Sequence, residues 1–259
     1  MTIMLAALLL ALQATPPPVT PVEKPFYRAQ HSPFCAEWRN TRGGTDDESR
    51  IRRAAYRLWV EGYISGFNIH GPDPAGDLVG AAAWEEVAAF VDDHCARNPS
   101  HAIVDAMRPL AAHFIRRRPE PTLRPPPVSC VVPGTCQARA GGPLRKRAMV
   151  AMTATCGHWN EDRDNPVLRM AYGRFAVGGY LTAYNLWGPD PAGDVIGSGD
   201  SAVVDFWLDQ WCRDRPAHML IFAMQPLIDH LAAERAAGRL PPPGMRPTDR
   251  LSPASRERD

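Results

Sequence analysis

One seven-residue segment occurs twice in this chain, and this duplication constrains the fold more than any other feature. Gly71–Asp77 (Gly-Pro-Asp-Pro-Ala-Gly-Asp) recurs letter for letter as Gly188–Asp194, 117 positions later. Around the two copies, residues 54–114 align with residues 171–231 without a gap. A repeat of this period in a chain of 259 residues predicts two copies of one structural unit.

The apolar pattern within each copy is helical. Apolar residues fall three and four positions apart, which is the period of one helix face, and no segment alternates with period two. We expect a polar loop after the first cysteine of each copy and three helices after that loop. In the first copy Asp46 or Asp47 caps the first helix, and Asn98-Pro99 starts the third. The expected helices span about 47–68, 84–95, 99–118, 166–185, 201–212 and 216–237. Pro109 and Pro226 interrupt the third helix of each copy at matching places.

The predicted fold class is therefore all-α, with two tandem three-helix repeats, each closed by a disulfide, joined by a Pro-rich linker. Composition places the boundaries between the segments. They are a signal peptide (1–14), a Pro-rich leader without a core (15–33), helical repeat 1 (34–118), a Pro-rich linker (119–143), helical repeat 2 (144–238) and a disordered tail (239–259).

The N-terminus has the pattern of an export signal. The apolar run Ile3–Leu12 is shorter than the roughly 20 residues of a membrane span. It suits a signal-peptide core with cleavage near Ala14, although an uncleaved N-terminus remains the alternative. Export predicts a periplasmic or secreted protein that has no membrane contact after cleavage.

Six cysteines fit an oxidising compartment. Because Cys35 and Cys95 flank the first heptapeptide as Cys156 and Cys212 flank the second, we expect one disulfide in each repeat. The remaining pair, Cys130 and Cys136, lies six positions apart in the linker and would form a local bridge. Zinc ligation is the alternative, but no pair has the Cys-x-x-Cys spacing. The tryptophans that follow the first cysteines, Trp38 and Trp159, are expected to cover the disulfides.

Small residues interrupt the first long helix of each copy one turn apart. They are Gly62 and Gly66 in the first copy, and Gly179 and Ala183 in the second. A glycine inside a helix costs about 1 kcal/mol relative to alanine, so a compensating gain is needed. We expect that gain to be the close approach of another helix backbone.

The heptapeptides carry the first candidate site. Each copy offers an asparagine and two carboxylates, which are Asn68, Asp73 and Asp77 in the first copy and Asn185, Asp190 and Asp194 in the second. Oxygen ligands of this kind suit Ca²⁺, but two prolines intervene and no closing glutamate follows. A rigid turn whose aspartates accept backbone N–H bonds is the favoured interpretation. The sequence predicts no cofactor.

Histidines form the second candidate set. His101 matches His218, and His113 matches His230. The two histidines of each copy lie about 18 Å apart along one expected helix and cannot share a metal there. They are expected to be packing or surface residues, with pH sensing as a hypothesis that a fourfold His-to-Gln variant would test.

Other chemistries have weaker support. Lys and Arg number 29 against 28 Asp and Glu, so no net field favours nucleic acid. The Gly-x-Ser-x-Gly motif of a serine hydrolase is missing, and no pair of acids can be nominated for glycoside hydrolysis. Arg116-Arg117-Arg118 is interpreted as a solvated helix end.

Several short motifs resemble those of small exported bacterial helical proteins. They are Cys35-x-x-Trp38, the helix segment Gly62–Gly66 (Gly179–Ala183 in the second copy) and Cys95-Ala-Arg-Asn-Pro99 before a closing helix. They are similar to the HdeA/HdeB-type acid-stress chaperones and to the Rap1a/Tai immunity proteins, which neutralise secreted effectors in the periplasm. The similarity covers residues 35–118 and 156–238 and carries over no functional residue.

The resemblance implies a single helical domain without enzymatic activity in each copy. We therefore expect a non-catalytic protein that binds another protein, in the manner of an immunity protein or inhibitor. An acid-stress chaperone is the first alternative, and a cell-wall-active enzyme with a deep cleft and two convergent acids is the second. The two copies are expected to pair as an internal pseudo-dimer.

Overall fold

The computed structural model describes residues 24, 27–73, 75–80, 82–118, 152–161, 165, 169–197 and 201–240. Regular structure in this part of the chain is helical, without any strand, which confirms the all-α prediction. The expected signal peptide, the linker with Cys130 and Cys136, and nearly all of the expected tail lie outside the described residues. Leu240 is described and buried, although the tail was expected to begin at residue 239.

Each half of the chain contributes a series of helices around its own disulfide. The first half, residues 27–118, contains α2 (Cys35–Gly43), α3 (Asp47–His70), α4 (Trp84–Arg97) and α5 (Ile103–Arg117). The second half, residues 152–240, contains α6 (Cys156–Glu161), the π-helical turn η3 (Arg169–Arg174), α8 (Phe175–Trp187), α9 (Ala202–Arg213) and α10 (Ile221–Ala236). Asp46 caps α3 as expected, accepting from the Ser49 backbone N–H at 2.8 Å.

The prediction of a polar loop directly after the first cysteine is wrong. Residues 35–43 form α2, and the corresponding segment after Cys156 forms the shorter α6, so three helices do not describe either half. Glu37 accepts a hydrogen bond from the backbone N–H of Phe34 at 2.9 Å, which satisfies a donor at the start of α2. Trp38 is buried against the disulfide. Capping and burial together stabilise a helix whose sequence is largely polar.

The third helix of the first half also begins later than expected. It starts at Ile103, not at Pro99, because the preceding residues pair with the chain ahead of α2. Cys35 donates to the carbonyl of His101 at 2.8 Å, and Ile103 donates to that of Pro33 at 2.8 Å. The second half repeats this pairing, with Cys156 donating to His218 at 2.8 Å.

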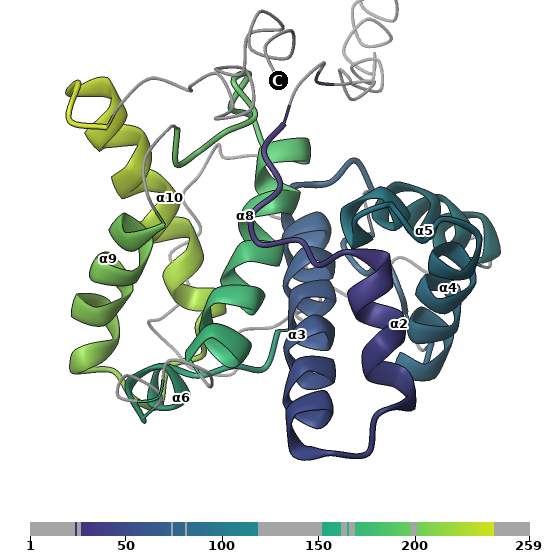
Figure 1. Ribbon diagram of the computed structural model, residues 1–259. Helices are drawn as coiled ribbons and strands as arrows, with labels where there is room; N and C mark the ends of the chain where they lie inside the picture. Colours follow the sequence, from purple (N-terminus) through teal and green to yellow (C-terminus); the bar gives the residue numbers. More distant parts are fainter. Residues whose placement is uncertain are drawn as a thin grey trace, which may run out of the picture.

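The centre of the molecule is the pair of helices α3 and α8, which lie side by side in Figure 1 with α4 and α5 on one side and α9 and α10 on the other. Glycines bring the two backbones together. A Cβ atom added at Gly62 would lie 2.0 Å from the carbonyl oxygen of Ala176, and one at Gly179 would lie 1.9 Å from that of Trp59. The predicted reason for these glycines, close approach of another helix, is confirmed.

Reciprocal side-chain contacts accompany the backbone contact. Trp187, at the end of α8, donates to the hydroxyl of Tyr63 on α3 at 2.9 Å. The matching residue at the end of α3, His70, hydrogen-bonds the hydroxyl of Tyr180 on α8 at 2.9 Å. Each half therefore completes the polar contacts of a tyrosine that lies deep in the other half.

The segments that lead into α2 and α6 cross to the opposite half. The backbone N–H of Gln30 donates to Thr182 of α8 at 2.8 Å, and that of Met152 donates to the matching Ser65 of α3 at 2.9 Å. Gln30 is 6% exposed, and its carbonyl accepts from the Trp59 indole at 2.8 Å. The leader was expected to lack a core, but residues 27–33 pack in the interface between the halves, because the crossing backbone finds hydrogen-bond partners on both central helices.

Candidate functional site

The first heptapeptide loop is a network of backbone contacts made by its polar side chains. Asn68 Oδ1 accepts from the backbone N–H of Leu78 at 2.7 Å. Asp73 Oδ1 accepts from Ala75 at 3.0 Å, and Asp77 Oδ1 accepts from Gly80 at 3.0 Å. These are the contacts of the rigid-turn interpretation, in which the carboxylates satisfy backbone donors.

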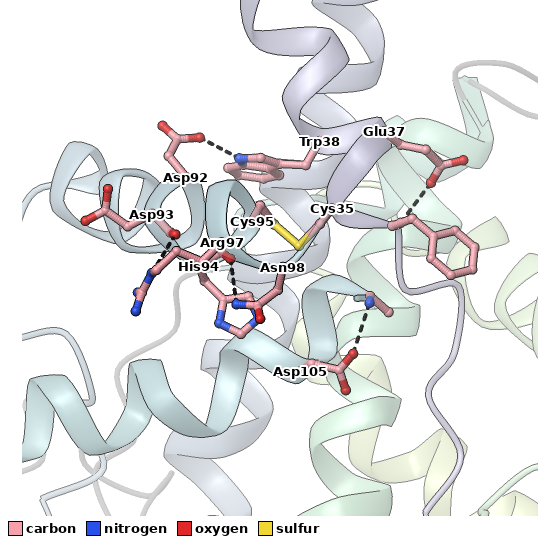
Figure 2. Close-up of a disulfide and its surroundings, with 12 residues drawn as sticks. Cys35, Glu37, Trp38, Asp92, Asp93, His94, Cys95, Arg97, Asn98 and Asp105 are labelled. Atoms are coloured by element: carbon pink, nitrogen blue, oxygen red, sulfur yellow. Dashed lines mark hydrogen bonds between the residues drawn. A yellow bond between two sulfur atoms is a disulfide. The ribbon is translucent and has the colours of Figure 1, made fainter. Parts of the chain in front are cut away.

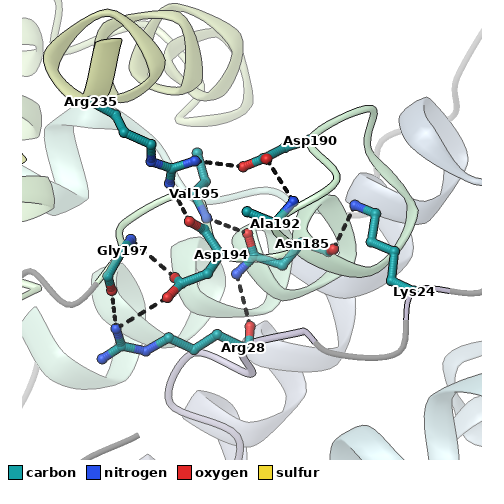
Figure 3. Close-up of polar contacts among 9 residues, drawn as sticks. All are labelled: Lys24, Arg28, Asn185, Asp190, Ala192, Asp194, Val195, Gly197 and Arg235. Atoms are coloured by element: carbon teal, nitrogen blue, oxygen red, sulfur yellow. Dashed lines mark hydrogen bonds and ion pairs between the residues drawn. The ribbon is translucent and has the colours of Figure 1, made fainter. Parts of the chain in front are cut away.

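The second loop repeats the network bond for bond, as Figure 3 shows in part. Asn185 accepts from Val195 at 2.8 Å, Asp190 from Ala192 at 3.0 Å, and Asp194 from Gly197 at 3.1 Å. In both loops the second glycine of the heptapeptide has a positive φ, 64° at Gly76 and 62° at Gly193. Because only glycine adopts this conformation without strain, the turn itself accounts for that residue.

Arginines from the closing helices lock the loops. Arg118, just past the end of α5, donates to Asp73 Oδ1 at 2.8 Å and also to the carbonyl of Asp77. Arg235 of α10 makes the matching bonds to Asp190 Oδ2 at 2.8 Å and to the carbonyl of Asp194. The interpretation of Arg118 as part of a solvated helix end is therefore wrong. The equal spacing of the two arginines from their aspartates was the sequence signal that could have revealed this role.

The loops do not gather the ligands of a metal ion. Among the described residues no group of three or more His, Cys, Asp or Glu side chains could hold one. In each loop the two carboxylates are directed to different donors, one to the closing arginine and one to the following glycine N–H. Each loop carboxylate thus already accepts a hydrogen bond from a backbone or arginine donor, as the rigid-turn interpretation expects.

Both predicted large disulfides are present. Cys35–Cys95 and Cys156–Cys212 each have Cα atoms 4.8 Å apart, and all four residues are fully buried. Figure 2 shows the first of them beside Trp38, whose indole donates to Asp92 at 2.6 Å. At the second, Trp159 donates to Asp209 at 2.7 Å. Both tryptophans belong to the core, as expected.

The four predicted histidines are not brought together. The side chains of His101 and His218 are exposed, and their backbone carbonyls pair with the cysteines. His113 is half-buried with its ring centroid 5.1 Å from that of Phe90, and His230 lies 6.1 Å from Trp207. The pH-sensing hypothesis for these four residues stays a prediction.

A fifth histidine, which the repeat did not single out, is better placed to respond to pH. His94 is 9% exposed at the end of α4, and its Nε2 has no hydrogen-bond partner in the described part of the chain. Its ring centroid lies 5.6 Å from that of His101. Burial lowers the pKa of His94, and His101 and Arg97 lower it further against the opposing charge of Asp105. The second half has Trp211 at the position that matches His94, so comparing the two copies does not single out this histidine.

This environment predicts an acid-dependent loss of stability. A histidine whose pKa in the folded state lies below its unfolded value of about 6.5 takes up a proton more readily on unfolding. The stability that neutral His94 contributes is therefore fully present above about pH 6.5 and is lost as the pH falls towards the lowered pKa of His94 in the folded protein. We expect His94→Gln to lose less stability than the wild type between neutral pH and mildly acidic pH, measured by urea unfolding. Identical losses in the two proteins would contradict the prediction.

Apolar side chains are exposed on the α9–α10 hairpin. Phe206 of α9 is 67% exposed, Phe222 of α10 is 60% exposed, and Val203 of α9 is 36% exposed. The three matching positions on α4 and α5 hold Ala89, Asp105 and Glu86. The first half also exposes two large apolar side chains, Phe34 (56%) and Ile115 (40%), but its residues that match Val203, Phe206 and Phe222 are small or acidic. We call Val203, Phe206 and Phe222 the α9–α10 surface.

A groove of about 280 Å³ lies beside the first loop. Its lining is apolar apart from Glu86, Arg117 and Arg118. Glu86 is 3.6 Å from Arg117, and the groove does not bring two acids together. It lacks the pair of convergent carboxylates that the cell-wall enzyme alternative requires.

Comparisons with known proteins give no significant match to this chain, whether to a protein-family model, a curated protein or a solved structure. In the described part of the chain, no helix has the length and apolar character needed to cross a membrane.

Proposed function

We propose that this protein is exported and non-catalytic, and that it binds another protein through the α9–α10 surface. The observation that carries the proposal is the exposure of Phe206 and Phe222, at positions where the first half holds alanine and aspartate. Exposed aromatic side chains on neighbouring helices are typical anchors of protein interfaces. The apolar run Ile3–Leu12 and the two disulfides support export.

We further propose that the two halves are copies of one helical module that pair as an internal pseudo-dimer. The backbone contact between α3 and α8, the reciprocal tyrosine contacts and the exchanged leading segments support this interpretation. All of them relate matching positions across one approximate two-fold axis, as an isologous interface does. In this arrangement α3 and α8 serve the pairing, which leaves the outer hairpins for partners.

Site-specific photo-cross-linking tests the binding surface. A benzophenone amino acid in place of Phe206 is expected to give one discrete adduct with another protein in the producing cell. The same amino acid in place of Ala89, the matching residue of α4, is the control and should give none. Phe222→Asp should abolish the adduct, and Phe206→Ala should weaken the isolated complex about tenfold or more. Equal adducts from both positions, or none from position 206, would refute the proposed surface.

An acid-responsive chaperone is the second candidate, and His94 is the observation that favours it. Protonation of this buried side chain would loosen the end of α4 beside the first disulfide. Acid would then expose apolar surface and increase the fluorescence of a hydrophobic dye. An increase that His94→Gln abolishes supports the chaperone, whereas unchanged dye binding from neutral to acidic pH excludes it.

A further inference from the structure

The two heptapeptide loops are built alike but are occupied differently. In the second loop, Arg28 of the leading segment lies against the turn (Figure 3). Its guanidinium donates to the carbonyl of Gly197 and lies 3.7 Å from Asp194 Oδ2. Its backbone N–H donates to Gly193 at 2.8 Å, and its carbonyl accepts from Asn185 at 2.8 Å. This loop is therefore a receptor for an arginine that arrives on an extended segment.

The first loop presents the same acceptors in the same arrangement. Asp77 Oδ1 accepts from Gly80 as Asp194 Oδ1 accepts from Gly197, and a closing arginine holds the carbonyl of each aspartate. The second carboxylate oxygen of Asp77 and the carbonyl of Gly80 thus correspond to the two groups that receive Arg28. These groups are fixed by the turn and need no rearrangement to bind a guanidinium.

Among the described residues, no arginine fills the corresponding place in the first loop. Within the described residues, the side chain of Asp77 forms no ion pair and contacts only the N–H of Gly80. Asp194 is 1% exposed and Gly197 is buried, whereas Asp77 is partly exposed and Gly80 is exposed. The sequence agrees with this difference. The backbone N–H groups of Gln30 and Met152 make corresponding bonds, to Thr182 and to Ser65. Arg28 lies two residues before Gln30, whereas the residue two positions before Met152 is apolar.

The surroundings suit the rest of an arginine side chain. The groove of about 280 Å³ beside Gly80 is lined by Leu78, Val79, Ala82 and Phe114, which can cover an aliphatic stem. Arg117 and Arg118 also line it, but Arg118 is paired with Asp73 at 2.8 Å and Arg117 with Glu86 at 3.6 Å. Asp77 directly precedes the lining residue Leu78, and its carboxylate has no cationic partner in the described part of the chain.

We propose that the first loop binds an arginine side chain of another protein, with the Asp77 carboxylate and the Gly80 carbonyl receiving its guanidinium. A planar guanidinium offers a fork of N–H donors that can reach a carboxylate and a neighbouring carbonyl together, which a point-like ammonium does less well. The second loop and Arg28 are the internal example of this recognition. The proposal does not depend on the α9–α10 surface.

Titration of the isotope-labelled full-length protein with a short peptide tests the proposal by NMR. The probe is acetyl-Tyr-Arg-Ala-amide, which copies Tyr27–Ala29, and the control peptide has glutamine in place of arginine. A single side chain in a shallow site is expected to bind in the millimolar range. We expect saturable shifts of the Asp77 and Gly80 amide signals with the arginine peptide and their loss with the glutamine peptide.

Asp77→Asn is the matched protein variant, because the amide oxygen can still accept from Gly80 while the charge is lost. It is expected to abolish the shifts and to leave the thermal midpoint unchanged, and Asp194→Asn is expected to preserve them. If a variant does not fold, the comparison of the arginine and glutamine peptides on the wild-type protein still tests arginine binding. Absent shifts at Gly80, equal shifts with both peptides, or shifts confined to Gly193 and Gly197 would each overturn the proposal.

Discussion

Gly179→Ala is expected to destabilise the whole molecule by about 3 kcal/mol or more. The added Cβ would lie 1.9 Å from the carbonyl oxygen of Trp59 and 2.9 Å from the backbone nitrogen of Tyr63. Because both atoms belong to the backbone of α3, no side-chain movement relieves the overlap, and the two central helices must separate. The gain of about 1 kcal/mol in helix propensity does not offset this cost. Urea unfolding measures the change.

Gly43→Ala is the matched control for this prediction. Gly43 is also helical, at the end of α2, but a Cβ added there meets nothing within 4 Å. Its substitution should leave stability unchanged or raise it slightly. Gly62→Ala, on the opposite helix, should resemble Gly179→Ala, because its Cβ would lie 2.0 Å from the carbonyl oxygen of Ala176. A Gly179→Ala protein as stable as the wild type would refute both the α3–α8 contact and the proposed pairing of the halves.

Removal of either large disulfide is expected to cost about 4 kcal/mol. Cys35–Cys95 joins residues 60 positions apart and Cys156–Cys212 residues 56 apart. In the chain-entropy model the cost depends on the logarithm of loop length, so the two losses should be nearly equal. Paired Cys-to-Ala variants, unfolded in urea under oxidising conditions, measure each loss.

Removal of the pair Cys130 and Cys136 gives a comparison for the loss of stability caused by removing either large disulfide. A bridge across so short a loop would contribute about 2 kcal/mol, roughly half as much as either large disulfide. Replacing both residues should therefore have the smallest effect of the three pairwise substitutions. If this linker variant lost more stability than the Cys35 and Cys95 variant, chain entropy would not explain how the disulfides stabilise the molecule.

The sequence was most informative where the same residue type recurred at matching positions. The exact heptapeptide, the paired cysteines and the small residues at 62 and 179 predicted the turns, the disulfides and the close helix contact. Pattern alone could not reveal α2, because its sequence is mostly polar and its stability comes from Trp38 and the disulfide. A helix is recognised in a sequence by a regular hydrophobic face, and α2 has none. Tertiary packing of Trp38 and the disulfide stabilises α2 instead.

The candidate sites were harder to predict because they depend on differences between the halves. Arg28 and Gln30 are not matched by residue type in the second half, so a search for repeated residues does not find them. His94 and Phe206 are likewise unmatched by residue type, since Trp211 and Ala89 hold the corresponding positions. Repetition reveals what both halves need for folding. Unmatched residues become interpretable only when the structure shows what surrounds them.

Joining both halves in one polypeptide has a consequence for stoichiometry. A dimer of identical chains displays every surface feature twice, so it offers two equivalent places for a partner. Here the first half holds Ala89 and Asp105 at the positions that match the exposed Phe206 and Phe222, and Arg28 lies against the second loop only. If a partner binds the α9–α10 surface or the first loop as proposed, it finds that feature once per molecule, and we expect the complex to contain one copy of each protein.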